Sequence, residues 1–333
     1  MKRRTNRKRA GLILSLCLAA LLLLSGCGGG ELPAGGGDED SLQVVTTIFP
    51  IYDWTANILG ENPGNVELVQ MLDNGVDLHS YQPTAEDMAR LSTCDLFIYV
   101  GGESDQWVKD ALKDALNPDM VVIDLLDVLG DQAKEEETVE GMESEAEDLL
   151  NEEGPEYDEH VWLSVKNAET LVQCINGELQ ELDPGNAGVY QANTEAYLAK
   201  LAALDAEYQA AVDSAEVKTL LFGDRFPFRY LTDDYGLEYY AAFAGCSAET
   251  EASFETVSFL AGKVDELGLK TVLTIDGSDR RIAETIVKSS KSRDAVIRVL
   301  DSMQTATAED VAAGKTYRSA MTENLAVLKE ALR

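Results

Sequence analysis

Only two histidines occur in this chain of 333 residues, and both lie in segments expected to be loops. His79 belongs to segment 77–83 (DLHSYQP), and His160 follows two acidic residues in segment 158–163 (DEHVWL). Imidazole nitrogen is a favoured ligand of zinc and also binds manganese and iron. In α/β proteins, ligands bind at loops beyond the carboxyl ends of strands. Either histidine alone would more often be a surface residue, so a metal site requires a fold that brings both loops together.

The elements that could position these loops are eight short apolar runs rich in β-branched residues. Each run has the length and composition of a buried strand, and helical patterns separate the runs. They lie at residues 44–48, 66–69, 96–100, 120–123, 219–222, 237–240, 271–275 and 295–299. Strands that alternate with helices form parallel sheets covered by helices. Because four runs lie in each half, we expect an α/β protein of two lobes, each a mostly parallel four-stranded sheet with helices.

One long helix is expected between the two sets of strands. Its apolar face recurs every three or four residues, at Tyr190, Thr194, Tyr197, Leu201, Leu204 and Tyr208. Helix-favouring alanines are frequent within it. A helix of about 25 residues is about 37 Å long, so this segment could run the length of the molecule and join the lobes as one backbone helix.

The N-terminus is organised like a secretory signal peptide. Six basic residues precede an apolar run of 14 residues, which leads to Leu24-Ser25-Gly26-Cys27. The run is shorter than the roughly 20 residues of a membrane-spanning helix, so a stop-transfer anchor is the less favoured interpretation. The ending resembles a bacterial lipobox, which implies that Cys27 is lipidated and holds the mature protein at the membrane. The glycines that follow suit a flexible tether.

The chain is strongly acidic, with a formal net charge of −33 at pH 7, and loss of the basic signal would make it more acidic still. This argues against a nucleic-acid partner, which needs a basic surface. Acidic residues are concentrated in segment 131–159, where Lys134 is the only base. We expect a mobile loop there that acts as a solvated tether; weak collection of cations near a site is the alternative.

The cysteines of the mature chain do not form a recognisable motif. Cys94, Cys174 and Cys246 remain after the signal and the anchor, an odd number without CxxC spacing, which gives no support to a zinc finger or a redox motif. Cys94 and Cys174 lie in apolar stretches and are expected in the core. Cys246 could reach a soft metal, but no partner for it is expected nearby.

Two motifs resemble those of the zinc and manganese solute-binding proteins of ABC importers. Residues 79–84 (HSYQPT) are similar to that family's HSYEPT segment, and residues 158–163 (DEHVWL) to its DPHVWLDP segment. Residues 45–50 (VTTIFP) are similar to its first strand, and the similarity extends over 44–301. The resemblance implies two α/β lobes joined by one rigid helix, with a metal ion bound between them by His79, His160 and two ligands from the second lobe.

The second-lobe ligands match the family at only one of two positions. Asp301, after the last strand, matches the family's aspartate, although a strand-end aspartate also caps turns. The third ligand is commonly His or Glu, but counting back from Tyr235-Gly236 places Arg225 there, and a guanidinium cannot donate to a metal. We therefore predict that Asp224 is the ligand and that Arg225 pairs with a carboxylate. The alternative is an Asp224–Arg225 ion pair and a site that lacks one ligand.

The predicted metal ligands are thus His79, His160, Asp224 and Asp301. Two imidazoles and two carboxylates neutralise a dication and suit Zn²⁺ or Mn²⁺, the transported ligand, rather than Cu⁺. The sequence does not choose between zinc, manganese and iron. Full coordination by protein leaves no position for a reacting water, which favours carriage over catalysis.

We therefore expect a monomeric binding protein, not an enzyme, that captures the ion outside the cytoplasm and delivers it to the permease of an ABC importer. One alternative is a metal-dependent hydrolase, against which stand the lack of an HExxH pattern and of a third histidine. The other is an adhesive surface lipoprotein without a ligand. The expected division of the chain is a signal peptide at 1–26, a flexible tether at 27–42, an N-terminal lobe at 43–185 with the acidic loop 131–159, a linking helix at 186–215 and a C-terminal lobe at 216–333.

Overall fold

The computed structural model describes residues 41–61, 65–143, 156–247 and 251–333. The predicted signal peptide and the Cys27 anchor lie outside these residues. Residues from Ser41 onward form one compact unit, and the account below concerns that unit alone. Within the described part of the chain, no helix is both long enough and apolar enough to cross a membrane.

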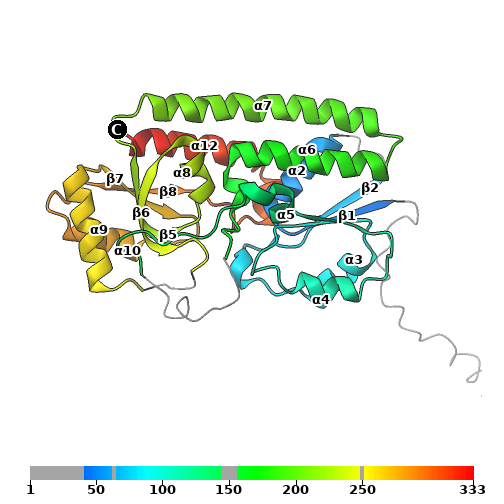
Figure 1. The fold of residues 1–333 in the computed structure, drawn as a ribbon, viewed down its shortest axis with the longest axis horizontal. Helices are drawn as coiled ribbons and strands as arrows, with labels where there is room; N and C mark the ends of the chain where they lie inside the picture. The colour runs from blue at the N-terminus through cyan, green and yellow to red at the C-terminus, as the bar shows by residue number, and fades with distance from the viewer. Residues whose placement is uncertain (1–40, 62–64, 144–155, 248–250) are drawn as a thin grey trace, which may run out of the picture. The chain divides into compact units, whose positions relative to one another are not determined.

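Two four-stranded parallel sheets form the framework (Figure 1). The first has the order β2-β1-β3-β4, and its strands are β1 Leu42–Thr46, β2 Val66–Gln70, β3 Leu96–Tyr99 and β4 Val121–Asp124. The second has the order β6-β5-β7-β8, and its strands are β5 Thr219–Phe226, β6 Glu238–Ala244, β7 Thr271–Ile275 and β8 Val296–Leu300. The predicted α/β fold with two four-stranded sheets is therefore confirmed.

The two sheets repeat one topology, in which the first strand of each half lies between the second and the third. In the first sheet, Val44 of β1 pairs with Leu68 on one side and Leu96 on the other. Val44 and Leu96 are fully buried, as expected of parallel strands covered by helices. The register of β5 against β6 is irregular between Phe222 and Arg225, and β5 continues to Phe226, beyond its predicted end.

The helices of the first half are α2 Phe49–Leu59, α3 Ala85–Thr93, α4 Val108–Lys113, α5 Leu125–Leu129 and α6 Val165–Leu182. A side chain accepts from a free N–H group at the start of α3, α5 and α6. Thr84 and Asp87 form a reciprocal capping box at the start of α3. The Ser164 side chain accepts from the Asn167 N–H at the start of α6. Between His160 and this cap lies one turn of 3-10 helix, Val161–Leu163, so the start of α6 also fixes the His160 loop.

The predicted linking helix is α7, Ala187–Asp213, which runs along both halves (Figure 1). All six residues of its predicted apolar face are buried. In the second half, the helices are α8 Arg229–Tyr235, α9 Phe254–Leu267, α10 Arg281–Ser289, α11 Ala308–Ala312 and α12 Tyr317–Ala331. A separate apolar cluster that includes Leu221, Phe243, Leu260 and Ile286 joins β5 and β6 to α9 and α10.

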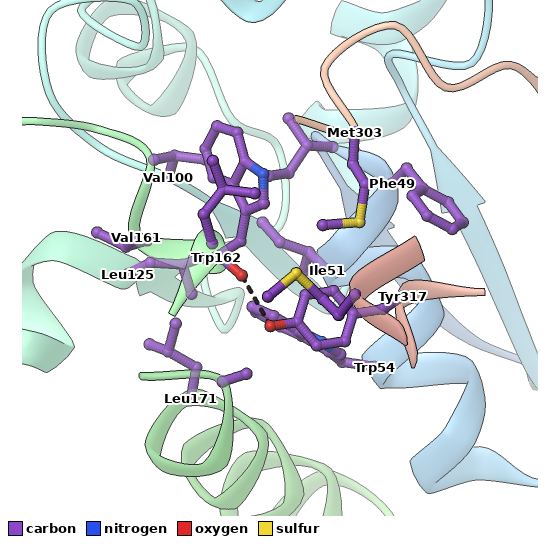
Figure 2. Close-up of a cluster of buried hydrophobic side chains, with 14 of the residues drawn as sticks. Phe49, Ile51, Trp54, Val100, Leu125, Val161, Trp162, Leu171, Met303 and Tyr317 are labelled. Carbon is purple, nitrogen blue, oxygen red and sulfur yellow. Dashed lines mark hydrogen bonds between the residues drawn. The ribbon is translucent and has the colours of Figure 1, made fainter. Parts of the chain in front are cut away.

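One large core is shared by the two halves (Figure 2). Trp162 of the first half donates from Nε1 to the backbone oxygen of Ser302 in the second half at 2.9 Å. Tyr317, at the start of α12, donates from its hydroxyl to the backbone oxygen of Trp162 at 2.8 Å. Its backbone N–H donates to Asp53 of α2 at 3.1 Å. Because all four residues are buried, these bonds hold the halves in one arrangement.

The acidic segment 131–159, which was expected to be a mobile loop, makes backbone hydrogen bonds in its described residues. Its two arms pair with each other through backbone hydrogen bonds. The Glu136 N–H donates to the Glu156 oxygen at 2.9 Å, and the Asp158 N–H donates to the Lys134 oxygen at 2.8 Å. A run of charges indicates low hydrophobicity, but it does not show which backbone groups find partners.

Candidate metal centre

The two histidines come together although they are 81 residues apart in the sequence. His79 lies in a 3-10 turn after β2, Leu78–Ser80, which Asp77 caps by accepting from the His79 N–H at 3.0 Å. His160 lies immediately before the turn that leads into α6. The Nε2 atoms of the two rings are 3.1 Å apart. A metal ion bound by both imidazoles requires this approach.

Hydrogen bonds at the opposite ring nitrogens orient both histidines. The Nδ1 atom of His160 is 2.9 Å from Oδ1 of Asp158, which also accepts from the His160 backbone N–H at 2.8 Å. The Nδ1 atom of His79 is 2.8 Å from the Ser104 hydroxyl and 3.5 Å from Oε2 of Glu159. Partners of this kind hold Nδ1 as the N–H tautomer and leave the Nε2 lone pair for a metal. Both lone pairs then point at the same place.

The charge around the rings is suited to a cation. Burial, followed by the neighbouring His160, lowers the pKa of His79 well below its usual range, so His79 is neutral and able to donate a lone pair. Burial alone would lower the pKa of His160, but Asp158, Glu159 and Glu136 outweigh it and raise that pKa. The carboxylates around His160 therefore favour a positive charge at this place, and they would stabilise a bound dication in the same way.

Cys246 completes a group of three potential ligands. One ligand atom from each of His79, His160 and Cys246 lies within 4.8 Å of the other two. The expectation that nothing near Cys246 could pair with it is therefore wrong. One feature of the sequence could have identified Cys246 as a candidate ligand. Gly245-Cys246 directly follows β6 and so lies at the carboxyl edge of the second sheet, where ligands bind in α/β proteins.

The two predicted aspartates are engaged elsewhere in this structure. Asp224 accepts from the Arg225 N–H at 2.9 Å and from the Ile275 N–H at 3.4 Å. Asp301 contacts Nζ of Lys315 at 2.7 Å and accepts from the Met303 N–H at 2.8 Å. Neither belongs to a group of three or more potential ligands among the described residues. Their role as metal ligands stays a prediction.

Arg225 pairs with a carboxylate, as expected, and the carboxylate is Asp77 of the first half. The guanidinium nitrogen and Oδ2 of Asp77 are 2.6 Å apart. Because Asp77 also caps the turn that carries His79, this ion pair links the strand β5 to the position of His79. An open cavity of about 550 Å³ lies beside these residues and is lined by His79, Asp224 and Arg225 among others. His79 is slightly exposed whereas His160 is fully buried, so an ion can reach the pair from the side of His79.

Comparison with known proteins gives consistent matches over this whole unit. The family model described as "Zinc-uptake complex component A periplasmic" matches residues 44–331. The high-affinity zinc uptake system protein ZnuA of Bacillus subtilis is 28% identical over 323 residues, which are 96% of this chain and 97% of that protein. The zinc-binding lipoprotein AdcA of Streptococcus pneumoniae is 31% identical over 321 residues, 95% of this chain and 60% of AdcA. The chain thus spans little more than half of the length of the AdcA relatives it matches.

A solved structure shows the same fold. The Zn(II)-bound ZnuA-like domain of Streptococcus pneumoniae AdcA superposes with a TM-score of 0.68 and is 26% identical. The match covers 88% of this chain and 99% of that domain.

Proposed function

Since the chain belongs to the family of the periplasmic zinc-uptake component A, called ZnuA, we propose that it captures Zn²⁺ between its two halves and delivers it to the permease of an ABC importer. The observation that carries this proposal is the pair of Nε2 atoms 3.1 Å apart. Each ring is held by its own Nδ1 partner, so the two donor atoms are in place before an ion arrives.

The chemistry of the site favours zinc as the cargo. Neutral imidazole is a common zinc ligand, and carboxylates around the rings stabilise the charge of a dication. The zinc-binding and zinc-uptake relatives support the same choice, whereas manganese rests on the wider family resemblance alone. The family consists of metal-binding transport proteins, and its periplasmic and lipoprotein members agree with the extracytoplasmic, membrane-anchored location predicted from the N-terminus.

Zinc binding is tested on protein stripped with a chelator. Calorimetric titration with ZnCl₂ should give one tight site in the parent protein, and the double variant His79→Ala/His160→Ala should lose it. A ligand that binds only the folded state raises its stability by about 4 kcal/mol at a thousandfold excess over Kd, so zinc should also raise the melting temperature of the parent but not of the variant. Melting without metal checks that the variant folds. Equal zinc affinity in both proteins would contradict the proposal.

Delivery to an importer needs a test in cells. Deletion of the gene should reduce uptake of radioactive zinc at low external zinc, and the parent gene, but not the double histidine variant, should restore it. Unchanged uptake after deletion would contradict delivery to an importer, even if the protein binds zinc. The hydrolase hypothesis makes a different prediction: zinc-loaded protein would turn over ester, phosphoester or peptide substrates, with loss of turnover in the histidine variant.

A further inference from the structure

We propose that Sγ of Cys246 is the third protein ligand of the bound ion, and that the resulting donor set of two histidines and one cysteine selects zinc over manganese. The inference rests on the proposed function, because it names the ligands and the metal preference of the same site. It differs from the ligand set predicted from the sequence, in which the second half supplies only carboxylates.

The distances suit a small tetrahedral ion. Zn–N bonds of about 2.0–2.1 Å and Zn–S bonds of about 2.3 Å place the ligand atoms of one ion about 3.3–3.6 Å from one another. The two Nε2 atoms are 3.1 Å apart, and the three-residue group lies within 4.8 Å. Small side-chain rotations therefore bring all three atoms to bonding distance.

The backbone before Cys246 lies directly against the imidazole of His160, and only glycine permits this. A Cβ atom added at Gly245 would lie 3.0 Å from Cε1 of His160 and 2.9 Å from the backbone oxygen of Phe226. Both distances are too short for an unstrained carbon contact. Gly245 thus allows the loop after β6 to approach His160 closely enough to present the next side chain to the ring.

The acidic segment fixes this loop from the other side. The Cys246 N–H donates to Oε1 of Glu136 at 2.9 Å. The Glu143 N–H donates to the backbone oxygen of Ala242, at the end of β6, at 3.0 Å. Tyr230 of α8 accepts from the Lys134 N–H at 3.0 Å and donates to the Asp158 oxygen at 2.8 Å. The same segment that ends at His160 therefore also holds the backbone of Cys246.

Two other strand-end positions of the second half are engaged in ion pairs. Arg225 stands at the end of β5 and is paired with Asp77, and Asp301 after β8 is paired with Lys315. A guanidinium has no lone pair to donate. Among the described residues, Cys246 is the side chain of the second half that joins the two histidines.

The coordination step balances without a further reactant. The Cys246 thiol releases its proton to solvent as the sulfur–metal bond forms, and nothing is oxidised or reduced. Thiolate is a soft ligand that zinc accepts readily, whereas manganese prefers carboxylate, carbonyl and water oxygens. The sulfur is therefore the donor that discriminates between the two ions.

The test uses Co²⁺ as a spectroscopic stand-in for zinc. Co²⁺ bound to the parent protein should show the near-ultraviolet charge-transfer absorption of a thiolate–cobalt bond. Cys246→Ser and Cys246→Ala should lose this absorption, whereas the matched control Cys174→Ser, on α6, should keep it. Zinc affinity should fall more than tenfold in both Cys246 variants, and manganese affinity should change less.

Three results would overturn the proposal. Parent protein without thiolate–cobalt absorption has no sulfur ligand. If Cys246→Ala binds zinc as tightly as Cys174→Ser, the sulfur of Cys246 contributes nothing to zinc affinity. An equal loss of zinc and manganese affinity would contradict the claim of selectivity. Thermal melting without metal verifies that each variant folds. If a variant does not fold, the cobalt spectrum of the parent protein alone tests the proposal. A parent protein that binds no zinc would instead refute the proposed function.

Discussion

The two halves of the centre differ in how their side chains are prepared for a metal. In the first half, His79 and His160 direct unsubstituted Nε2 atoms at each other, and both Nδ1 atoms are hydrogen bonded. In the second half, Arg225 and Asp301 are engaged in ion pairs. The first half is thus organised for binding, while ion pairs occupy the ends of β5 and β8 in the second half.

This difference shows where a ligand can be placed at the edges of two sheets of the same topology. The histidine loops are held by the shared core and the cap of α6, so their geometry leaves little freedom. In the loop after β6, Gly245 permits a close approach of the backbone to His160. A new donor is therefore easier to place on this loop than at the end of β5, where Arg225 already bonds Asp77.

The largest expected effect concerns Asp53, which accepts a hydrogen bond from the Tyr317 N–H and so connects the two halves of the molecule. Burial raises the pKa of Asp53 from 3.8 to about 6, against the lowering effect of the hydrogen bonds from Tyr317 and Tyr197. The pKa of Asp53 is therefore higher in the folded protein than in the unfolded chain, so protonation of this carboxyl favours the folded state. Its stabilising effect is complete below pH 3.8 and is lost as pH rises through about 6. Asp53→Asn should remove this dependence.

The measurement is urea unfolding of metal-free parent and Asp53→Asn at several pH values. The free energy of unfolding of the variant minus that of the parent should rise by up to about 3 kcal/mol between about pH 4 and about pH 7. A difference that stays constant over this range would show that Asp53 titrates normally.

The second largest effect is expected from the hydrogen bond between Asp158 and His160, which orients the imidazole. Asp158→Ala removes the carboxylate that orients His160, and loss of such a partner costs about 10–100-fold in metal affinity. We expect this loss for zinc in competition with a chromogenic chelator. Asp158→Asn should recover part of it, because the amide oxygen can still accept from Nδ1. If Asp158→Ala binds zinc as tightly as the parent, the orientation of His160 does not depend on Asp158.

A smaller effect is expected from the loop of the second half. Gly245→Ala should push the loop away from His160 and weaken zinc binding about tenfold, or about 1.4 kcal/mol. Gly262→Ala in α9 is the matched control, because an added Cβ there meets nothing within 4 Å. Calorimetry on both variants checks this. Equal affinities would show that the close approach of the loop is not needed for binding.

The smallest effects on zinc affinity are expected from the two engaged aspartates. Asp224→Ala and Asp301→Ala should each cost less than tenfold, under about 1.4 kcal/mol, because other groups occupy these carboxylates. A loss well above tenfold for either variant would identify it as a ligand and would restore the set predicted from the sequence.

Much of the fold was predictable because its signals are local. Apolar β-branched runs mark the strands, and the spacing of Tyr190, Thr194 and Tyr197 marks the buried face of α7. The limits of β5 and β6 were less predictable, since β5 continues through an irregular register to Phe226. Such extensions depend on pairing between strands rather than on hydrophobicity.

The site was predictable only in part, for a physical reason. His79 and His160 could be singled out because the chain has no other histidine and their motifs resemble a known family. The proximity of Cys246 depends on a contact between segments 86 residues apart and on a glycine that allows it. The acidic segment likewise makes hydrogen bonds to distant residues, such as that from the Cys246 N–H to the Glu136 carboxylate. Charge and composition do not report these contacts.

The shared core has a consequence for how the chain folds. The bond between Asp53 and Tyr317 joins residues 264 apart in the sequence, and that between Trp162 and Ser302 joins residues 140 apart. Closing such long segments slows folding, since their entropy is lost before the contacts form. The first sheet therefore lacks its finished interior until Tyr317 has been synthesised. If the predicted signal peptide directs export, this late completion of the fold would keep the leading end of the chain unfolded for longer, which suits passage through a channel that admits only unfolded polypeptide.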